Sequence, residues 1–110
     1  MIIVQVEHFL NEEGQDRYPT WIGRMGAVLS RFDGFLSIRQ LSNLANPDGC
    51  YLLIEFESAA QYEKWTNSSE YEELLVQMAG QTTSVQHTTL YEVGPRISRS
   101  GPEGKGILTK

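Results

Sequence analysis

The chain of 110 residues has one cysteine, two histidines and few long apolar stretches. The lone Cys50 leaves no intramolecular disulfide and no CxxC metal or redox motif, and we expect it to pack as a small hydrophobic residue. A membrane span needs about 20 mostly apolar residues, but the apolar N-terminal stretch is interrupted at Gln5 and no basic region precedes it. We therefore expect a cytoplasmic protein that contacts no membrane.

Basic residues are scarce as far as residue 93, where five of them face thirteen acidic ones, whereas residues 94–110 have four basic and one acidic. An acidic surface repels a phosphate backbone, and the basic end has no aromatic side chain on which a base could stack. No nucleic-acid partner is expected. Because residues 94–110 are rich in Gly, Pro and Ser without periodicity, we predict a flexible tail after one domain over 1–93.

Motifs for cofactor binding are also missing. The sequence has no glycine-rich nucleotide loop, no flavin fingerprint and no nucleophile elbow. Two histidines without a third ligand at a fixed spacing do not predict a metal site. We therefore expect neither a cofactor nor a metal.

Hydrophobic periodicity predicts the order strand, helix, strand, strand, helix, strand. Residues 2–10 alternate as a half-buried strand with Val4, Val6 and His8 on one face. The other predicted elements are a helix from the polar segment after residue 10 to residue 32, strands over 35–45 and 50–57, an interrupted helix from 59 to 80, and a strand over 82–93.

Local signals place the ends of these elements. Pro19 is expected in the first turn of the first helix, where its missing N–H costs nothing. Residues 46–49 (NPDG) predict the reverse turn of a hairpin. Ser58 is a predicted N-cap, and Ser69 is a second one after the interruption of the later helix.

The order of elements predicts an α+β, ferredoxin-like βαββαβ fold. Right-handed crossovers place the first and third strands in the middle of an antiparallel sheet with the helices on one face. The other face keeps apolar and aromatic side chains that need cover. We therefore expect a homodimer, in which a second copy covers this face to form a dimeric α/β barrel.

Two segments resemble the antibiotic biosynthesis monooxygenase (ABM) family: residues 31–35 (RFDGF) and 56–71 (FESAAQYEKWTNSSEY). The resemblance covers residues 1–93 and implies a dimeric α/β barrel. In the quinone-forming members, a polar residue, a Trp and a Tyr contact a flat polyphenolic substrate. The matching positions are Gln61, in place of an Asn, Trp65 and Tyr71.

The resemblance argues against haem chemistry, because the haem-degrading members need an axial histidine where this chain has Leu75. Each implied contact also has a structural alternative: Trp65 and Tyr71 can simply fill the space between helix and sheet. His8 and His87 are candidate bases for a phenol proton, and either can instead be a surface residue. Their parity with nearby valines predicts that both point from one sheet face.

Three functions remain open from the sequence. One is a cofactor-independent monooxygenase of a small aromatic or quinol-type substrate, which activates oxygen itself once ionised. Another is an isomerase-type small-molecule enzyme on the same barrel, with a histidine as acid and base. The last is a non-catalytic dimeric ligand-binding or stress-response protein. A deep pocket with a histidine favours the enzymes, and a pocket filled by side chains favours the binding protein.

Overall fold

The computed structural model describes residues 1–99 and 101–102. Its elements are β1 (Ile2–Leu10), α1 (Glu12–Leu29), β2 (Phe35–Asn43), β3 (Asn46–Phe56), α2 (Ala59–Thr66), α3 (Ser69–Met78), the 3-10 turn η1 (Ala79–Gln81), β4 (Thr82–Glu92), β5 (Ile97–Ser98) and β6 (Gly101–Pro102). This confirms the predicted order, with the second helix in two pieces. In the described residues no helix is both long and apolar enough to span a bilayer.

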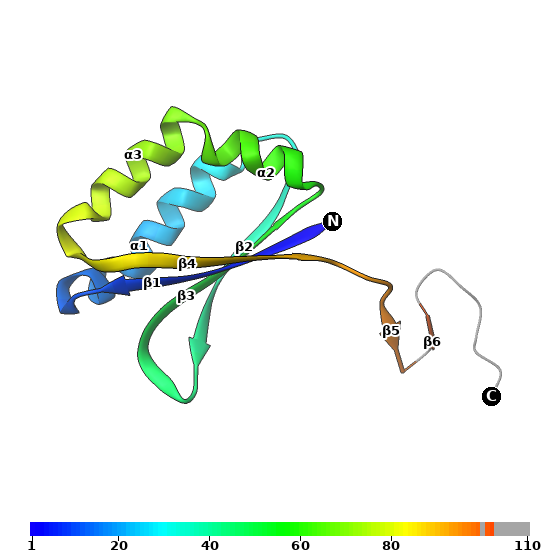
Figure 1. The fold of residues 1–110 in the computed structure, drawn as a ribbon, viewed down its shortest axis with the longest axis horizontal. Coiled ribbons are helices and arrows are strands. Elements are labelled where there is room, and N and C mark those ends of the chain that lie inside the picture. Colours follow the sequence, from blue (N-terminus) through cyan, green and yellow to red (C-terminus); the bar gives the residue numbers. More distant parts are fainter. Residues whose placement is uncertain (100, 103–110) are drawn as a thin grey trace.

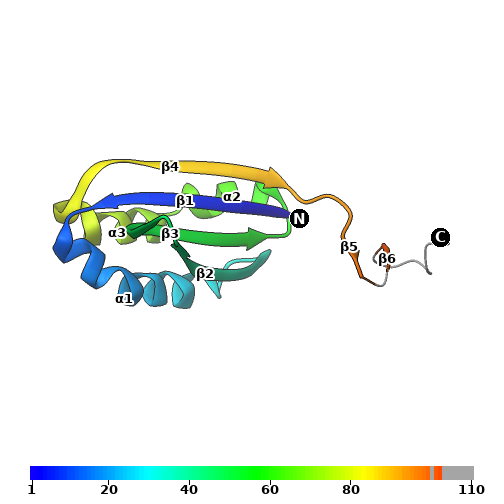
Figure 2. The same cartoon turned by 90° about the horizontal axis from the view of Figure 1, so that it is seen from below.

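The main sheet has the strand order β2-β3-β1-β4, and every neighbouring pair is antiparallel. Figure 2 shows the four strands side by side, and Figure 1 shows the three helices on one side of them. The first and third strands thus lie in the middle, as predicted. The chain has the ferredoxin-like α+β fold that its pattern of elements indicates.

The core lies between the sheet and the helices. Every second residue of β1 and β3 points into it, because strand side chains alternate between the two faces. Its buried residues are Ile2, Val4, Val6, Leu10, Tyr18, Trp21, Ile22, Met25, Leu29, Cys50, Leu52, Ile54, Phe56, Trp65, Leu74 and Met78. The prediction that Cys50 packs as a small hydrophobic residue is confirmed.

Helix α1 begins earlier than the proline suggests. The side chain of Asn11 caps it by accepting a hydrogen bond of 2.9 Å from the Gly14 N–H. Pro19 therefore lies inside the helix, and its predicted place in the first turn was wrong. The capping Asn and the two acidic residues after it outweigh the preference of proline for the first turn.

The hairpin turns two residues earlier than predicted. β3 begins at Asn46, so residues 46–49 belong to the strand and the turn consists of Leu44 and Ala45. The Asn43 side chain accepts a hydrogen bond from the Ala45 N–H at 2.9 Å. This local Asx-type bond closes the turn and replaces the NPDG turn.

The break between α2 and α3 places two aromatic residues next to each other. Ser58 caps α2 as predicted, but Ser68, not Ser69, caps α3: its hydroxyl accepts from the Tyr71 N–H at 3.1 Å. The same hydroxyl donates to the Trp65 carbonyl at 2.6 Å. One serine therefore ends one helix and begins the next.

The described part of the predicted tail runs away from the sheet as an extended segment (Figure 1). Within it, Ile97–Ser98 pairs with Gly101–Pro102 in a sheet of its own. Residues 100 and 103–110 of the predicted flexible tail lie outside the described residues. The flexibility of residues 94–110 and the domain boundary at residue 93 stay predictions.

Candidate functional site

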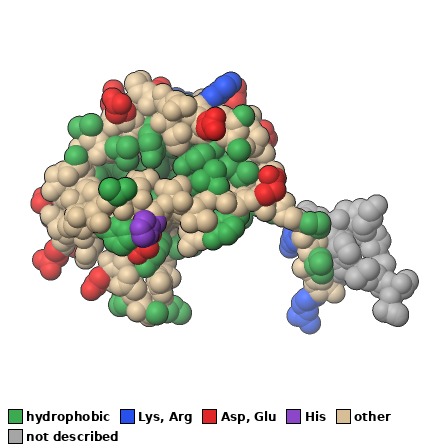
Figure 3. Space-filling model, viewed as in Figure 1, with side chains coloured by type: hydrophobic (Ala, Val, Ile, Leu, Met, Phe, Trp, Pro, Cys, Tyr) green, Lys and Arg blue, Asp and Glu red, His purple; other side chains and the backbone are tan. Residues whose placement is uncertain are grey.

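A narrow cavity of about 10 Å³ lies between the sheet and the helices. Its lining side chains include no Asp, Glu, Lys or Arg, and His8 is the histidine among them. They are Val6, His8, Trp21, Met25, Leu52, Ile54, Tyr62, Trp65, Tyr71, Leu75 and Gln86. A second cavity of about 40 Å³ shares His8, Trp21, Leu75 and Gln86 with it. Figure 3 shows hydrophobic side chains around a hollow between the helices and the sheet edge.

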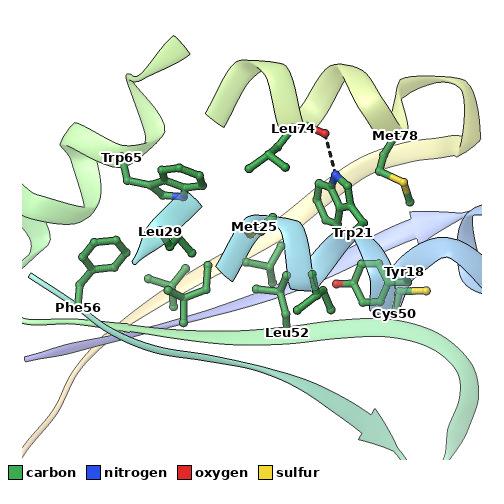
Figure 4. Packing of buried hydrophobic residues seen from close by; sticks show 14 of the residues in the cluster. Tyr18, Trp21, Met25, Leu29, Cys50, Leu52, Phe56, Trp65, Leu74 and Met78 are labelled. Carbon is green, nitrogen blue, oxygen red and sulfur yellow. Dashed lines mark hydrogen bonds between the residues drawn. The ribbon is translucent and has the colours of Figure 1, made fainter. Parts of the chain in front are cut away.

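Trp65 forms the wall of this cavity on the side of α2. It is fully buried, and its ring makes edge contacts with Phe32 and Tyr71, at centroid distances of 5.0 and 5.3 Å. Its indole Nε1 has no hydrogen-bond partner within residues 1–99 and 101–102, and it lies on the ring edge that faces the sheet (Figure 4). By contrast, Trp21 Nε1 donates to the Leu74 carbonyl at 2.8 Å. A buried N–H without a partner is costly and rare.

Tyr62 and Tyr71 border the same space from α2 and α3. Burial, with a further contribution from the nearby Tyr71, raises the pKa of Tyr62 to about 12. Tyr62 therefore keeps its proton at neutral pH and is a donor, not a base.

His8 lies at the far end of the cavity, on the inner face of β1. Its Nδ1 is 2.7 Å from the Tyr18 hydroxyl, and its ring meets Trp21 edge-on at 5.2 Å. Burial lowers the pKa of His8 to about 4, although a hydrogen bond with Gln86 opposes this shift. His8 is therefore neutral at pH 7.

Gln86 is the polar side chain from β4 in this cavity. Its Nε2 lies 3.5 Å from the Tyr71 hydroxyl and 3.2 Å from the Thr88 hydroxyl. Sequence reasoning missed Gln86 as well as Tyr18. The parity of Gln86 with Leu90, which pairs with the buried Val4, was the available signal.

His87 points from the opposite face of the sheet. It pairs with Glu7 in the β1–β4 register and contacts Phe9, whereas Gln86 lies on the inner face. The prediction that both histidines share one face was wrong. The prediction placed His87 on the same strand face as Val85 and took that face to be the core side. Val85 is exposed on an edge strand, so it does not mark the core side.

Gln61 does not line the cavity. Its side chain lies against Gly34 and accepts a hydrogen bond from the Ser58 hydroxyl at 3.1 Å. Gly34 has φ of +85°, so glycine is needed there for the backbone as well as for the space that Gln61 occupies. The structure thus brings Trp65, Tyr71 and His8 together and leaves Gln61 and His87 elsewhere. Their functional roles stay predictions.

A metal ion has no evident site here. Within residues 1–99 and 101–102, no three His, Cys, Asp or Glu side chains converge as a metal ion requires. The chemistry of this cavity is that of hydrogen-bond donors and aromatic faces.

The fold and the cavity define a ferredoxin-like α+β protein with an aromatic-lined pocket between helices and sheet. The sequence model described as antibiotic biosynthesis monooxygenase matches residues 1–93, so the chain belongs to the ABM family. This confirms the resemblance seen in the sequence. No curated protein matches the chain.

Solved structures share the fold at low sequence identity. A putative antibiotic biosynthesis monooxygenase from Deinococcus radiodurans is 14% identical, with a TM-score of 0.78 and coverage of 92% of this chain and 100% of the other. Rv0793 from Mycobacterium tuberculosis is 14% identical, with a TM-score of 0.73 and coverage of 88% of this chain and 98% of the other. A variant of SnoaB, a cofactor-independent oxygenase from Streptomyces nogalater, is 10% identical, with a TM-score of 0.68 and coverage of 84% of this chain and 92% of the other. These likenesses show the fold alone.

Proposed function

We propose that the chain is a cofactor-independent monooxygenase that oxidises a small aromatic, quinol-type substrate. It acts as a cytoplasmic homodimer, with one substrate pocket between the helices and the sheet of each subunit. Membership of the ABM family supports an oxygenase, and the sequence has no nucleotide or flavin motif. SnoaB, which has the same fold, is named a cofactor-independent oxygenase.

The observation that carries this proposal is Trp65, which is fully buried, lines a cavity walled by aromatic rings and has an N–H without a partner in the described residues. A ligand oxygen next to this N–H would satisfy it. The faces of Trp65 and Tyr71 suit a flat ring. Because no carboxylate lines the cavity, an anionic oxygen there meets donors and no repelling charge.

The chemistry needs only the substrate and molecular oxygen. For an anthrone, the methylene carbon loses a proton to water and the anion binds in the pocket, where O₂ forms a bond with that carbon. A proton returns to the distal oxygen to give a hydroperoxide. Loss of water then breaks the O–O bond and leaves a carbonyl. One oxygen atom enters the product and the other leaves as water, so no external reductant is used. The pocket stabilises the anion and keeps water away.

The size of the cavity favours a second candidate, a non-catalytic ligand-binding protein. Small-molecule pockets usually measure about 300–1,000 Å³, and this cavity holds about one water molecule. A bicyclic ligand therefore requires Leu75 and Gln86, which border both cavities, to move. Leu75 is 37% exposed on α3, so this displacement does not open the core.

Oxygen uptake separates the two candidates. The protein is mixed with an anthrone or a naphthoquinol, and an oxygen electrode records consumption above the buffer rate. We expect acceleration by the parent protein and a loss of about tenfold or more in Trp65→Phe, which keeps an aromatic ring and removes the N–H.

The control is Leu44→Ala, at the hairpin tip, where the side chain is 96% exposed and far from the cavity. It should match the parent. Binding without acceleration, for a panel of quinols, would favour the non-catalytic protein.

A further inference from the structure

Tyr18 lies outside the cavity but holds a residue inside it. Its side chain is fully buried, and within the described residues its hydroxyl has one hydrogen-bond partner, Nδ1 of His8 at 2.7 Å. Burial raises the pKa of Tyr18, so the hydroxyl keeps its proton. Cys50, opposite His8 on β3, offers only a thiol, which is a weak acceptor.

The direction of this hydrogen bond follows from the burial. If Nδ1 of His8 carried the proton, the Tyr18 O–H would be buried without an acceptor, which is costly. If Tyr18 donates, both groups are satisfied. Nδ1 then accepts, and the proton of the neutral ring sits on Nε2.

The other ring nitrogen of His8, Nε2, is the donor on the side of β4. With Nδ1 occupied by Tyr18, Nε2–H is the donor that the neutral ring has left, and Gln86 lines the same two cavities as His8. Its side chain raises the pKa of His8, as an amide oxygen turned toward Nε2–H would. The amide nitrogen of Gln86 then faces the hydroxyls of Tyr71 and Thr88. The oxygen of Tyr71 accepts, which leaves its own proton for the cavity that it lines.

We infer that Tyr18 and Gln86 are positioning residues that orient His8 and Tyr71, so that the pocket presents hydrogen-bond donors to a bound aromatic molecule. The donors run in one direction, from Tyr18 through His8 and Gln86 to Tyr71. The Trp65 N–H adds a second unpaired donor. The ligand class is an aromatic ring with an acceptor oxygen, a phenolate or a quinone carbonyl. This inference rests on the proposed function for its ligand, and His8 serves in it as a donor instead of a base.

The first test needs no ligand. Nitrogen-15 NMR of histidine-labelled protein shows which ring nitrogen is protonated, and a His87→Gln background leaves His8 as the one signal. We expect Nε2–H at pH 7. In Tyr18→Phe, which removes only the hydroxyl, the tautomers should mix and the titration of His8 should move up by about one pH unit, because the bond that favours the neutral ring is lost.

The matched control is Tyr51→Phe. The Tyr51 hydroxyl accepts from Asn46 at 3.0 Å, away from the cavity. It should leave the His8 signals unchanged. The titratable or polar groups that face His8 are Tyr18, Cys50 and Gln86, and Glu7 and Asp48 border an open depression beside it. A proton on Nδ1 in the parent protein would overturn the inference, even if Tyr18→Phe failed to fold. An unchanged titration in a folded Tyr18→Phe would overturn it too.

The second test uses two probes of similar shape. The carbonyl oxygens of 1,4-naphthoquinone only accept hydrogen bonds, and naphthalene has no polar atom. We expect Tyr71→Phe to weaken naphthoquinone binding about tenfold and to leave naphthalene binding unchanged. Equal weakening of both probes would overturn the donor role of Tyr71. Binding of neither probe would overturn the ligand class and the proposed function, whereas the NMR result stands on its own.

Discussion

Trp21 and Trp65 differ in one respect that decides their roles. Both are buried between helices and sheet, at 3% and 0% exposure. The N–H of Trp21 is bonded to the Leu74 carbonyl and ties α1 to α3, but that of Trp65 is unpaired. A native protein keeps such a group where it serves a ligand or a strained site. The hydrogen bond of Trp21 is thus structural, and in the function that we propose the Trp65 N–H is left for a ligand.

The same substitution at both tryptophans tests this difference. Trp21→Phe loses ring area and a hydrogen bond to the Leu74 carbonyl, whereas Trp65→Phe loses ring area but removes an N–H that has no partner in the described residues. We expect Trp21→Phe to lower the free energy of unfolding by about 1–2 kcal/mol more than Trp65→Phe. Urea unfolding in the absence of ligand measures both. An equal loss at the two positions would mean that the Trp65 N–H has a partner in solution.

His8 makes the stability of the fold depend on pH. Burial lowers the pKa of His8 from 6.5 to about 4. Between these two pH values, His8 is mostly protonated in the unfolded chain and mostly neutral in the folded one. The free energy of unfolding therefore has its full value above pH 6.5, and it falls as the pH is lowered toward 4. The full shift corresponds to about 3 kcal/mol, and solvent at the partly exposed ring reduces it.

Melting temperatures between pH 7 and 4 measure this effect. His8→Gln should flatten the fall, because its side chain does not titrate, and His87→Gln on the open face should keep it. Carboxylates titrate over part of this range in all three proteins, so the comparison among them isolates His8. The same slope in the parent and in His8→Gln would contradict the assignment.

At the scale of elements, the short break between α2 and α3 shapes the site. Ser68 caps α3 and bonds back to the Trp65 carbonyl, which sets the ring of Tyr71 edge-on against that of Trp65. A continuous helix would place residues 65 and 71 on different faces, since six residues make about one and two-thirds turns. The break therefore builds the aromatic wall of the cavity.

The tail is an element with a separate prediction. The family match ends at residue 93. In the described part of the tail, Ile97–Ser98 pairs with Gly101–Pro102, and Ile97 is exposed. Removal of residues 95–110 should leave the melting temperature nearly unchanged, because little apolar area is lost from the fold. Differential scanning calorimetry checks this, and a fall of more than a few degrees would mean that the tail docks on a partner subunit.

At the scale of the whole molecule, one face of the sheet is not covered by helices, and its apolar side chains would be buried by a partner subunit. Ile3, Leu41, Tyr51 and Leu53 are only half-buried there, on three neighbouring strands. Polar groups, including His87, share this face. A second copy is the simplest cover, because one self-complementary patch then serves both subunits.

We expect a dimer at micromolar concentration, with more than about 1,000 Å² of buried surface. Ile3→Glu, on the central strand β1, should give monomers, since it buries a carboxylate opposite the acidic Glu55 of β3. Val76→Glu, on the exposed side of α3, is the matched control and should remain dimeric. Light scattering gives the masses, and a monomeric parent protein would contradict the closed barrel.

The sequence by itself determined the order of the elements and the inner faces of β1 and α1. β1 follows the prediction residue for residue, and Ile22, Met25 and Leu29 are buried at helical spacing. Segments 31–35 and 56–71 together indicated the family that the comparison confirms. These features depend on neighbours along the chain, so periodicity and capping residues record them.

Only the tertiary structure decided which side chains meet. The contact of His8 with Tyr18 depends on how α1 packs on β1, and the place of Gln86 depends on a β1–β4 register that shifts between Glu7 and Phe9. A shift of one residue turns every strand side chain to the other face. Such a register is set by packing between segments far apart in the chain, and no local pattern in either segment contains it.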